Sequence, residues 1–176
     1  MNIVSYNCFN FKSNHLMIKK LIDSNDIYFF IEHWLGNAED FLFTDLCSST
    51  HDIIFQSNFN EEVKNTRRKG RPFCRKCWII QRNLTVKSFE NLSEVVSKLV
   101  IQTGNSETFL IYGLWIPFDD NTPAKLGILH STFSLFEAEL SNNANVFVVV
   151  MGDFSCDLKR KKLSIFNLKI LFQITV

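Results

Sequence analysis

The stretch VFVVVMGDFSCD, Val146–Asp157, decides how the rest of the chain is interpreted. Its six apolar residues, 146–151, are followed by Gly152 and then at once by the acid Asp153. A short apolar run of this kind predicts a strand that is covered on both faces. In open α/β sheets ligands bind beyond the ends of the strands, so we expect Gly152 to turn the backbone and Asp153 to face a ligand there.

Strand patterns recur along the rest of the chain. Runs rich in apolar, β-branched and aromatic residues are bounded by polar residues and glycine. They predict single strands over 2–6, 26–32, 51–57 and 76–81, and a hairpin of 95–103 with 108–116 around the turn 104–106. The polar run 58–70 predicts a long loop.

Helix patterns lie between these strands. Ser13 is a candidate N-cap for a helix that ends near Asn25, and residues 38–46 fit two further turns. Thr122 and Pro123 begin the clearest helix, which ends at 142–143. The first helix is expected to bury an apolar face made of Leu16, Met17, Leu21 and Ile22. This order predicts an α/β protein with a mixed sheet flanked by helices.

Composition narrows the class of protein. The chain has 176 residues, of which 46% are hydrophobic and 21% charged, and this is typical of one soluble globular domain. The formal net charge of +1 indicates no general attraction to nucleic acid, so any attraction must be local. With neither a membrane-length apolar run nor a signal-peptide pattern, we expect an intracellular protein, nuclear or cytoplasmic, that is not secreted and has no membrane partner.

Five cysteines at unequal spacing predict reduced thiols rather than a disulfide framework. Cys74 and Cys77 form a Cys-x-x-Cys pair, which raises the alternative of a zinc or redox site. Structural zinc needs a second pair of ligands at comparable spacing, and the sequence has none. An incidental pair is therefore favoured.

Polar residues stand where three of the predicted strands end: Asn7, Glu32 and Asp153. Oxygen ligands of this kind suit Mg²⁺, which is typically held by one or two carboxylates together with substrate phosphate. A bound Mg²⁺ could polarise a phosphoryl oxygen while a nearby carboxylate activates water. The alternative is that Asn7 and Glu32 only cap surface loops.

Five segments in this order resemble one known superfamily: SYNCFNF (5–11), IEHWL (31–35), GRPF (70–73), GLWIPFDDN (113–121) and GDFSCD (152–157). Together they are similar to the endonuclease/exonuclease/phosphatase superfamily, and look closest to the apurinic-type endonuclease domain of non-LTR retrotransposons. The resemblance extends from Asn2 to about Lys162. It implies a four-layer α/β sandwich of two packed sheets and the activity of a magnesium-dependent phosphodiesterase.

The resemblance also implies roles for particular residues. Asn7 matches an asparagine near the scissile phosphate, Glu32 the main metal-binding acid, and Asp153 the acid that orients or deprotonates the attacking water. The expected cofactor is Mg²⁺, with Mn²⁺ as an alternative ion. Asn7 and Asp153 are further candidates for contact with the metal.

The chain departs from the family at four places. Ser155 stands where the family usually has asparagine, Trp115 where it often has tyrosine, and Cys74 and Arg75 where related elements tend to have two glycines. A Ser-Asp-His-type motif is also absent, since none of the 19 residues after Asp157 is histidine. We therefore expect a single domain over 1–176 that is truncated at its C-terminus, with catalysis impaired or lost. Ser155 and Trp115 remain candidate catalytic residues.

None of the four histidines is predicted to replace the missing one. His33 follows Glu32 in a segment expected to be extended, so its side chain should face away from Glu32. His15 and His130 lie in predicted helices, and His51 begins a predicted strand. Surface or packing roles are favoured for all of them.

A basic cluster precedes the strand at 76–81. Six of the ten residues 67–76 are basic: Arg67, Arg68, Lys69, Arg71, Arg75 and Lys76. Such clustering can neutralise DNA phosphates without reading sequence, although a solvated loop is the common alternative. The 18 phenylalanines are expected in the core rather than in base stacking.

Three other functions stay open at this point. A non-catalytic remnant could bind DNA or another partner through the loop 67–76. A phosphatase-type relative could act on a small phosphoester, although the basic loop argues against this. A truncated reading frame could have no function of its own. Protein partners are not indicated by the sequence.

Overall fold

The structure is a computed structural model that describes residues 1–35, 39–47, 49–57, 75–116, 123–143 and 146–154. The chain divides into two compact units, Met1–Thr85 and Val86–Val176. Two four-stranded sheets, each containing parallel and antiparallel pairs, are flanked by helices. The prediction of an α/β protein with mixed sheets is confirmed, and the single-domain assignment stays a prediction.

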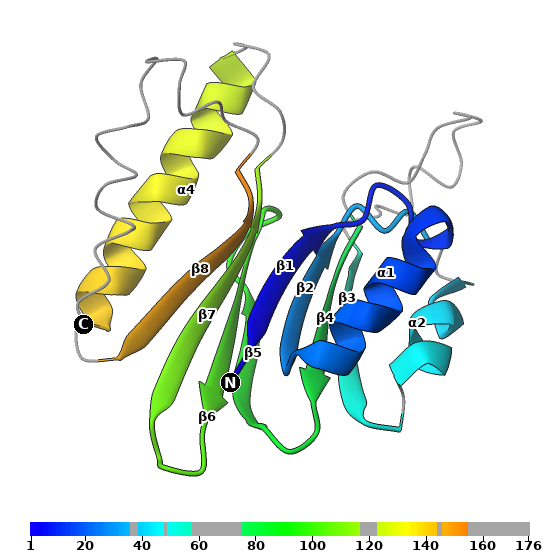
Figure 1. The fold of residues 1–176 in the computed structure, drawn as a ribbon. Coiled ribbons are helices and arrows are strands. Elements are labelled where there is room, and N and C mark those ends of the chain that lie inside the picture. The colour runs from blue at the N-terminus through cyan, green and yellow to red at the C-terminus, as the bar shows by residue number, and fades with distance from the viewer. Residues whose placement is uncertain (36–38, 48, 58–74, 117–122, 144–145, 155–176) are drawn as a thin grey trace. The chain divides into compact units, whose positions relative to one another are not determined.

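The sheet of unit 1 has the strand order β1-β2-β4-β3. Its strands are β1 (Ile3–Asn7), β2 (Ile27–Ile31), β3 (His51–Ser57) and β4 (Arg75–Gln81). β1 and β2 are parallel and are joined by α1 (Phe11–Ser24), whereas β4 pairs antiparallel with both β2 and β3. Figure 1 shows α1 and α2 (Phe41–Cys47) on the same face of this sheet. All five residues of β2 are buried, as its continuous apolar pattern predicts.

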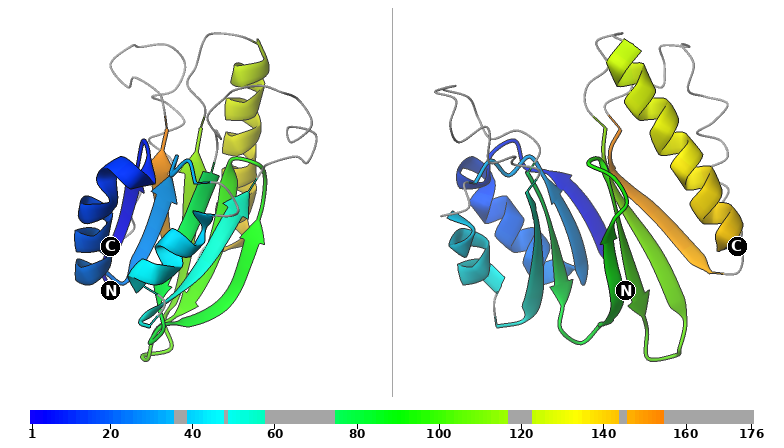
Figure 2. Two further views of the ribbon diagram at one scale, coloured as in Figure 1. Left: turned by 90° about the vertical axis from the view of Figure 1, so that its right-hand side faces the viewer. Right: turned by 180° about the vertical axis from the view of Figure 1, so that it is seen from behind.

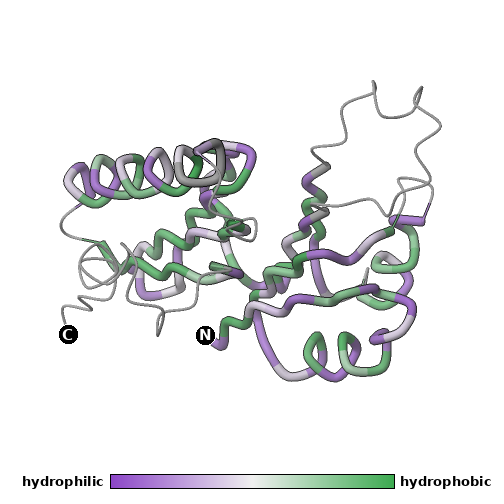
Figure 3. Tube along the Cα trace, turned by 90° about the horizontal axis from the view of Figure 1, so that it is seen from above, coloured by the Kyte–Doolittle hydropathy of each residue, from purple (hydrophilic) through white to green (hydrophobic). Residues whose placement is uncertain are grey.

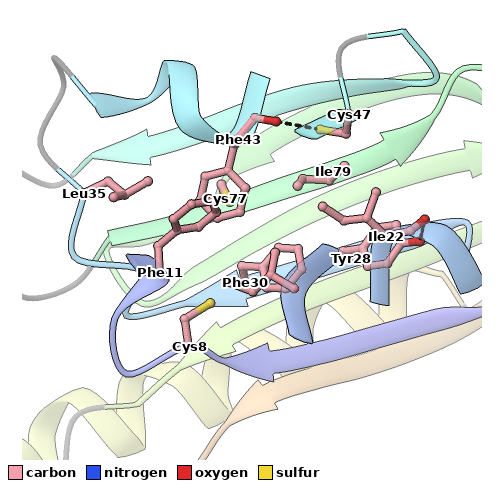
Figure 4. Close-up of a cluster of buried hydrophobic side chains, with 11 residues drawn as sticks. Cys8, Phe11, Ile22, Tyr28, Phe30, Leu35, Phe43, Cys47, Cys77 and Ile79 are labelled. Atoms are coloured by element: carbon pink, nitrogen blue, oxygen red, sulfur yellow. Dashed lines mark hydrogen bonds between the residues drawn. The ribbon is translucent and has the colours of Figure 1, made fainter. Parts of the chain in front are cut away.

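An aromatic cluster joins the helices of unit 1 to their sheet (Figure 4). The ring of Phe43 lies 4.4 Å from that of Phe11 and 5.6 Å from that of Phe30, measured between centroids. The hydroxyl of Tyr28 donates to the carbonyls at the end of α1, and burial raises its pKa to about 12. β2 is therefore tied to α1 by packing and by hydrogen bonds.

The buried face of α1 differs from the predicted one. The helix begins two residues before Ser13, and its N-cap is Asn10, whose side chain accepts a hydrogen bond from the backbone N–H of Lys12. This start places Phe11, Ile18 and Ile22 in the core. Leu16 is instead 67% exposed and Met17 46% exposed, so their assignment to the buried face was wrong.

The second sheet has the strand order β5-β6-β7-β8. Its strands are β5 (Thr85–Asn91), β6 (Val96–Gln102), β7 (Thr108–Trp115) and β8 (Phe147–Asp153), and its helix is α4 (Pro123–Asn142). The predicted hairpin is confirmed as the antiparallel pair β6–β7, and β8 pairs parallel with β7. β5 was not predicted, because most of its side chains are exposed and leave no strong apolar alternation.

α4 lies over the strands of its own sheet (Figure 2). Apolar residues are concentrated in the strands, whereas polar and apolar residues alternate along α4 (Figure 3). The ring of Phe136 packs edge-on against that of Tyr112, with centroids 5.3 Å apart. One turn along the helix, Glu139 Oε2 accepts hydrogen bonds from Lys98 Nζ at 2.8 Å and from Tyr112 Oη at 2.9 Å. These contacts fix the position of α4 on β6 and β7.

Among the helices that the structure describes, none is both long and apolar enough to cross a membrane.

The contact of Glu139 makes the stability of unit 2 depend on pH. Burial alone would raise the pKa of this carboxyl, but the hydrogen bonds from Lys98 and Tyr112 outweigh burial and lower it from 4.5. A lowered pKa in the folded state stabilises the protein above the pKa of the unfolded chain, and this contribution is lost as the pH falls through the folded value. In urea titrations, Glu139→Gln should therefore lower the free energy of unfolding most at neutral pH, and the deficit should shrink below about pH 4.5. Glu137→Gln, an exposed change on the same helix, is the matched control for the loss of one carboxylate, and a deficit for Glu139→Gln that is independent of pH would contradict this account.

Candidate functional site

The parallel pair β1–β2 brings two of the predicted site residues together. Asn7, the last residue of β1, is paired with Ile31, the last residue of β2, and Glu32 follows directly. The backbone N–H of Cys8 continues the pairing by donating to the carbonyl of Ile31 at 2.8 Å. Because the strands run parallel, Asn7 and Glu32 leave the sheet at the same edge.

The turn after β1 fixes the orientation of the Asn7 amide. The backbone N–H of Phe9 donates to Asn7 Oδ1 at 3.1 Å, so the oxygen of the amide is the end held inside the turn. Asn14 Nδ2 of α1 donates to the carbonyl of Cys8 at 2.7 Å and holds the turn from the helix side. The amide nitrogen of Asn7, which carries two N–H groups, is therefore the end suited to an anionic ligand.

The segment after β2 is not extended, contrary to the prediction for Glu32 and His33. Glu32 has φ 55° and Trp34 has φ 56°, which is the left-handed region of backbone conformation. For a residue other than glycine this conformation costs roughly 1–3 kcal/mol and persists only where the surroundings impose it. The half-buried carboxylate of Glu32 is thus carried by a strained backbone.

The parallel pair β7–β8 of unit 2 brings together two further predicted residues. Asp153 is the last residue of β8 and is paired with Trp115, the last residue of β7. The backbone N–H of Ile116 donates to the carbonyl of Asp153 at 2.8 Å, and both paired side chains are half-buried. Asp153 therefore lies inside the strand, whereas the sequence predicted that the strand stops at Met151.

Gly152 is needed because β8 passes very close to the backbone of β7 at this position, and not because the chain turns there. It has φ 138° and is paired with Leu114 of β7. A Cβ atom at this position would lie 1.9 Å from the carbonyl oxygen of Leu114. Only glycine lets the strand pass this carbonyl and continue to Asp153, so the prediction that Gly152 turns the chain was wrong.

Most of the predicted DNA-binding cluster lies outside the described residues, namely Arg67, Arg68, Lys69 and Arg71. Ser155 and Cys74 also lie outside them. Arg75 is the first residue of β4, and its side chain is also outside the described part. Lys76 is 0% exposed and is paired with Ile31 in the middle of the sheet. A buried ammonium cannot meet a DNA backbone at the surface, so the assignment of Lys76 to that cluster was wrong.

The residues at the edge of β1 and β2 fit a hard divalent cation. They offer an amide and a carboxylate, and Mg²⁺ takes oxygen ligands, keeps several waters and needs few protein groups. Within the described ranges, no group of three or more histidine, cysteine or acidic side chains could hold a metal ion by itself. A zinc-type cage is therefore not formed there, whereas a site completed by water and phosphate remains compatible with Asn7 and Glu32.

The three thiols that the structure describes in unit 1 are core residues. Cys8, Cys47 and Cys77 are buried and free. Burial raises the pKa of all three thiols, to about 11 for Cys47. A neutral, buried thiol is a poor metal ligand and a poor nucleophile. For Cys77 this favours the incidental interpretation of the Cys-x-x-Cys pair.

Replacing Gly152 tests whether the close approach of β8 to β7 determines the position of Asp153. Gly152→Ala should lower the free energy of unfolding and displace the end of β8, because its methyl group would overlap the carbonyl oxygen of Leu114. Gly127→Ala is a matched control: nothing lies within 4 Å of the added atom, and alanine in a helix should stabilise by about 0.5–1 kcal/mol. Urea unfolding and the amide NMR shifts of residues 150–154 measure both effects, and equal behaviour of the two variants would contradict the close-approach account.

Comparison with known proteins gives similarity in structure only. No protein-family model matches the sequence, and no curated protein matches it.

Several solved structures match the fold. TDP2 from C. elegans has a TM-score of 0.59 at 12% identity, over 89% of this chain and 48% of that protein. The human Nocturnin catalytic domain, solved with bound sulfate, has a TM-score of 0.62 at 10% identity, over 89% of this chain and 65% of that domain. An endonuclease/exonuclease/phosphatase family protein from Bacteroides thetaiotaomicron has a TM-score of 0.61 at 12% identity, over 92% of this chain and 65% of that protein.

The chain therefore spans about half to two thirds of the length of the structures it matches. At identities of 10–12%, the similarity supports a shared fold but not a shared activity. The two mixed sheets and their helices therefore share the fold of these structures, one of which is described as an endonuclease/exonuclease/phosphatase family protein.

Proposed function

We propose that this chain is a magnesium-dependent phosphodiesterase of the DNA endonuclease type, derived from a non-LTR retrotransposon. The observation that carries the proposal is the register of the two parallel strand pairs. β1–β2 ends at the pair Asn7 and Ile31, directly before Glu32, and β7–β8 ends at the pair Trp115 and Asp153. Each pair thus delivers to the edge of its sheet the residue types that phosphodiester hydrolysis requires.

Glu32 is the proposed main ligand of Mg²⁺, with Mn²⁺ as a substitute ion; Asn7 could add a ligand only through the second lone pair of Oδ1, which already accepts from the N–H of Phe9. When bound, the metal would polarise a phosphoryl oxygen and offset charge that develops in the reaction. The Asn7 amide is oriented by the N–H of Phe9, so one N–H of its nitrogen would donate to a phosphate oxygen. The remaining metal ligands would be water and substrate, as is usual for Mg²⁺.

Asp153 is the proposed group that orients the attacking water and accepts its proton. A carboxylate at the end of a paired strand is held more rigidly than one on a loop, which favours an orienting role. Trp115 and Ser155 are supporting candidates. An indole N–H and a hydroxyl can each donate to phosphate, although neither reproduces the tyrosine or the asparagine of the family pattern.

DNA is the proposed substrate because of the basic residues between β3 and β4 and at the first position of β4. Arg67, Arg68, Lys69, Arg71 and Arg75 could neutralise backbone phosphates without reading sequence. Such binding would weaken steeply as salt is added.

Hydrolysis by these 176 residues alone should be slow. No histidine follows His130, so the chain has no counterpart of the family's phosphate-contacting histidine. Loss of one preorganised donor to the developing charge typically costs on the order of a hundredfold or more in rate.

Nicking of supercoiled plasmid tests the proposal. We expect slow conversion to the open-circular form that requires Mg²⁺ or Mn²⁺, and we expect Glu32→Gln or Asp153→Asn to abolish it. The matched control is Asp52→Asn, which removes a carboxylate on β3 that is 65% exposed and forms an ion pair with Arg82 at 3.0 Å. This control should nick at the wild-type rate.

Three results would contradict the proposal. Nicking that survives EDTA would exclude the metal. Nicking that survives Glu32→Gln would exclude the assigned ligand. Hydrolysis of a small phosphoester without plasmid nicking would exclude DNA as the substrate. A 2′,3′-cyclic phosphate is a suitable probe, because the matching structure ANGEL2 is described as a 2′,3′-cyclic phosphatase.

A further inference from the structure

We propose that His33 is a positioning residue: its buried imidazole holds the backbone at Glu32 in the conformation that presents the metal-binding carboxylate. This inference rests on the role proposed above for Glu32. It assigns His33 no contact with metal or substrate.

His33 is anchored on its side-chain end. It is 1% exposed, and its ring meets the rings of Phe43 of α2 and Phe55 of β3 edge-on, with centroids 5.4 Å and 6.3 Å apart. Its Nδ1 accepts a hydrogen bond from the backbone N–H of Leu35 at 3.3 Å. That bond closes a short loop around Trp34, the second residue of this segment with left-handed φ.

His33 is also anchored through its backbone. Its carbonyl accepts a hydrogen bond at 3.0 Å from the N–H of Phe11, the first residue of α1. The first N–H groups of a helix have no partner inside the helix, so this bond satisfies a donor that would otherwise need water. Phe11 itself packs on Phe43, so α1, α2 and the segment after β2 meet at His33.

These anchors explain how the strained backbone persists. Glu32 and Trp34 flank His33, and both have positive φ, a conformation that is strained for residues other than glycine. A residue keeps such a conformation only where its surroundings impose it. Before Glu32 the constraint is the pairing of Ile31 with Asn7, and after it the constraint is the buried imidazole of His33. Release of His33 should let Glu32 relax to negative φ, which would change the direction in which its carboxylate leaves the end of β2.

Two substitutions separate positioning from simple packing. His33→Phe keeps an aromatic ring against Phe43 and Phe55 but removes the acceptor for the N–H of Leu35. His33→Asn loses the ring but keeps an acceptor, because Oδ1 of asparagine lies the same number of bonds from Cα as Nδ1 of histidine. A packing role predicts that His33→Phe is the milder change, and a positioning role predicts that His33→Asn is.

The experiment has two readouts on the purified chain. The first is the intraresidue HN–Hα NOE of Glu32, which is strong for positive φ because the two hydrogens are then close. The second is Mn²⁺ affinity by calorimetry, with Glu32→Gln as the reference for a lost site. We expect the wild type and His33→Asn to keep the strong NOE. We expect His33→Phe to lose it and to bind Mn²⁺ about 10–100-fold more weakly, the usual effect of removing a group that orients a ligand.

The outcomes separate this inference from the proposed function. If His33→Phe keeps both the NOE and the affinity, or if His33→Asn loses them while His33→Phe does not, the positioning role is wrong. If the wild type binds no Mn²⁺, or Glu32→Gln binds it equally well, the proposed function fails. In that case the NOE alone decides whether His33 holds the backbone at Glu32.

Discussion

The parallel register of β1 and β2 is the constraint on which the candidate site depends. Asn7 is paired with Ile31, and a shift of one residue would move every side chain of β1 to the other face and separate Asn7 from Glu32. The register is held by burial, since all five residues of β2 are buried and the rings of Tyr28 and Phe30 belong to the core cluster formed with α1 and α2. Stability of the core and geometry of the site are therefore set by the same contacts.

Strain is concentrated where the polar residues leave the strands. Phe9, Asn10, Glu32 and Trp34 have positive φ in unit 1; in unit 2 Gly152 has it near the end of β8, and Ser106 has it in the turn between β6 and β7. In unit 1 the cost is offset by hydrogen bonds to Asn7 Oδ1, to the Asn10 side chain and to His33 Nδ1. In unit 2 glycine removes the steric conflict with Leu114. Both parallel pairs thus end in unusual backbone, which is typical of positions that serve a site rather than the fold.

Sequence patterns were sufficient wherever burial follows a regular period. β2, β3, the β6–β7 hairpin and α4 lie where their apolar residues predicted them. The apolar patterns gave missing or wrong predictions where another factor determines which residues are buried. β5 is exposed and has little apolar alternation, and α1 starts at an asparagine cap that shifts its buried face to Phe11, Ile18 and Ile22. Lys76 reads as part of a basic run, but its position in the central strand β4 buries it.

The same distinction applies to the candidate site. Its residue types and their placement at strand ends were visible in the sequence, because strand ends follow from apolar runs. The pairing of Asn7 with Ile31 depends on long-range register, and the left-handed backbone at Glu32 depends on side chains from α2 and β3; neither has a local signature. The buried role of His33 could have been suspected only from its place between Glu32 and the apolar pair Trp34–Leu35.

Paramagnetic broadening by Mn²⁺ tests the central claim most directly, since it locates the ion without requiring catalysis. At substoichiometric Mn²⁺, the side-chain NH₂ signals of Asn7 and the backbone amide of Glu32 should broaden first. The opposite end of the same strands supplies an internal control, because Asp26 offers a carboxylate there beside Asn2. Broadening centred on Asn2 and Asp26, or spread equally over the exposed acids, would contradict a metal site at the ends of β1 and β2.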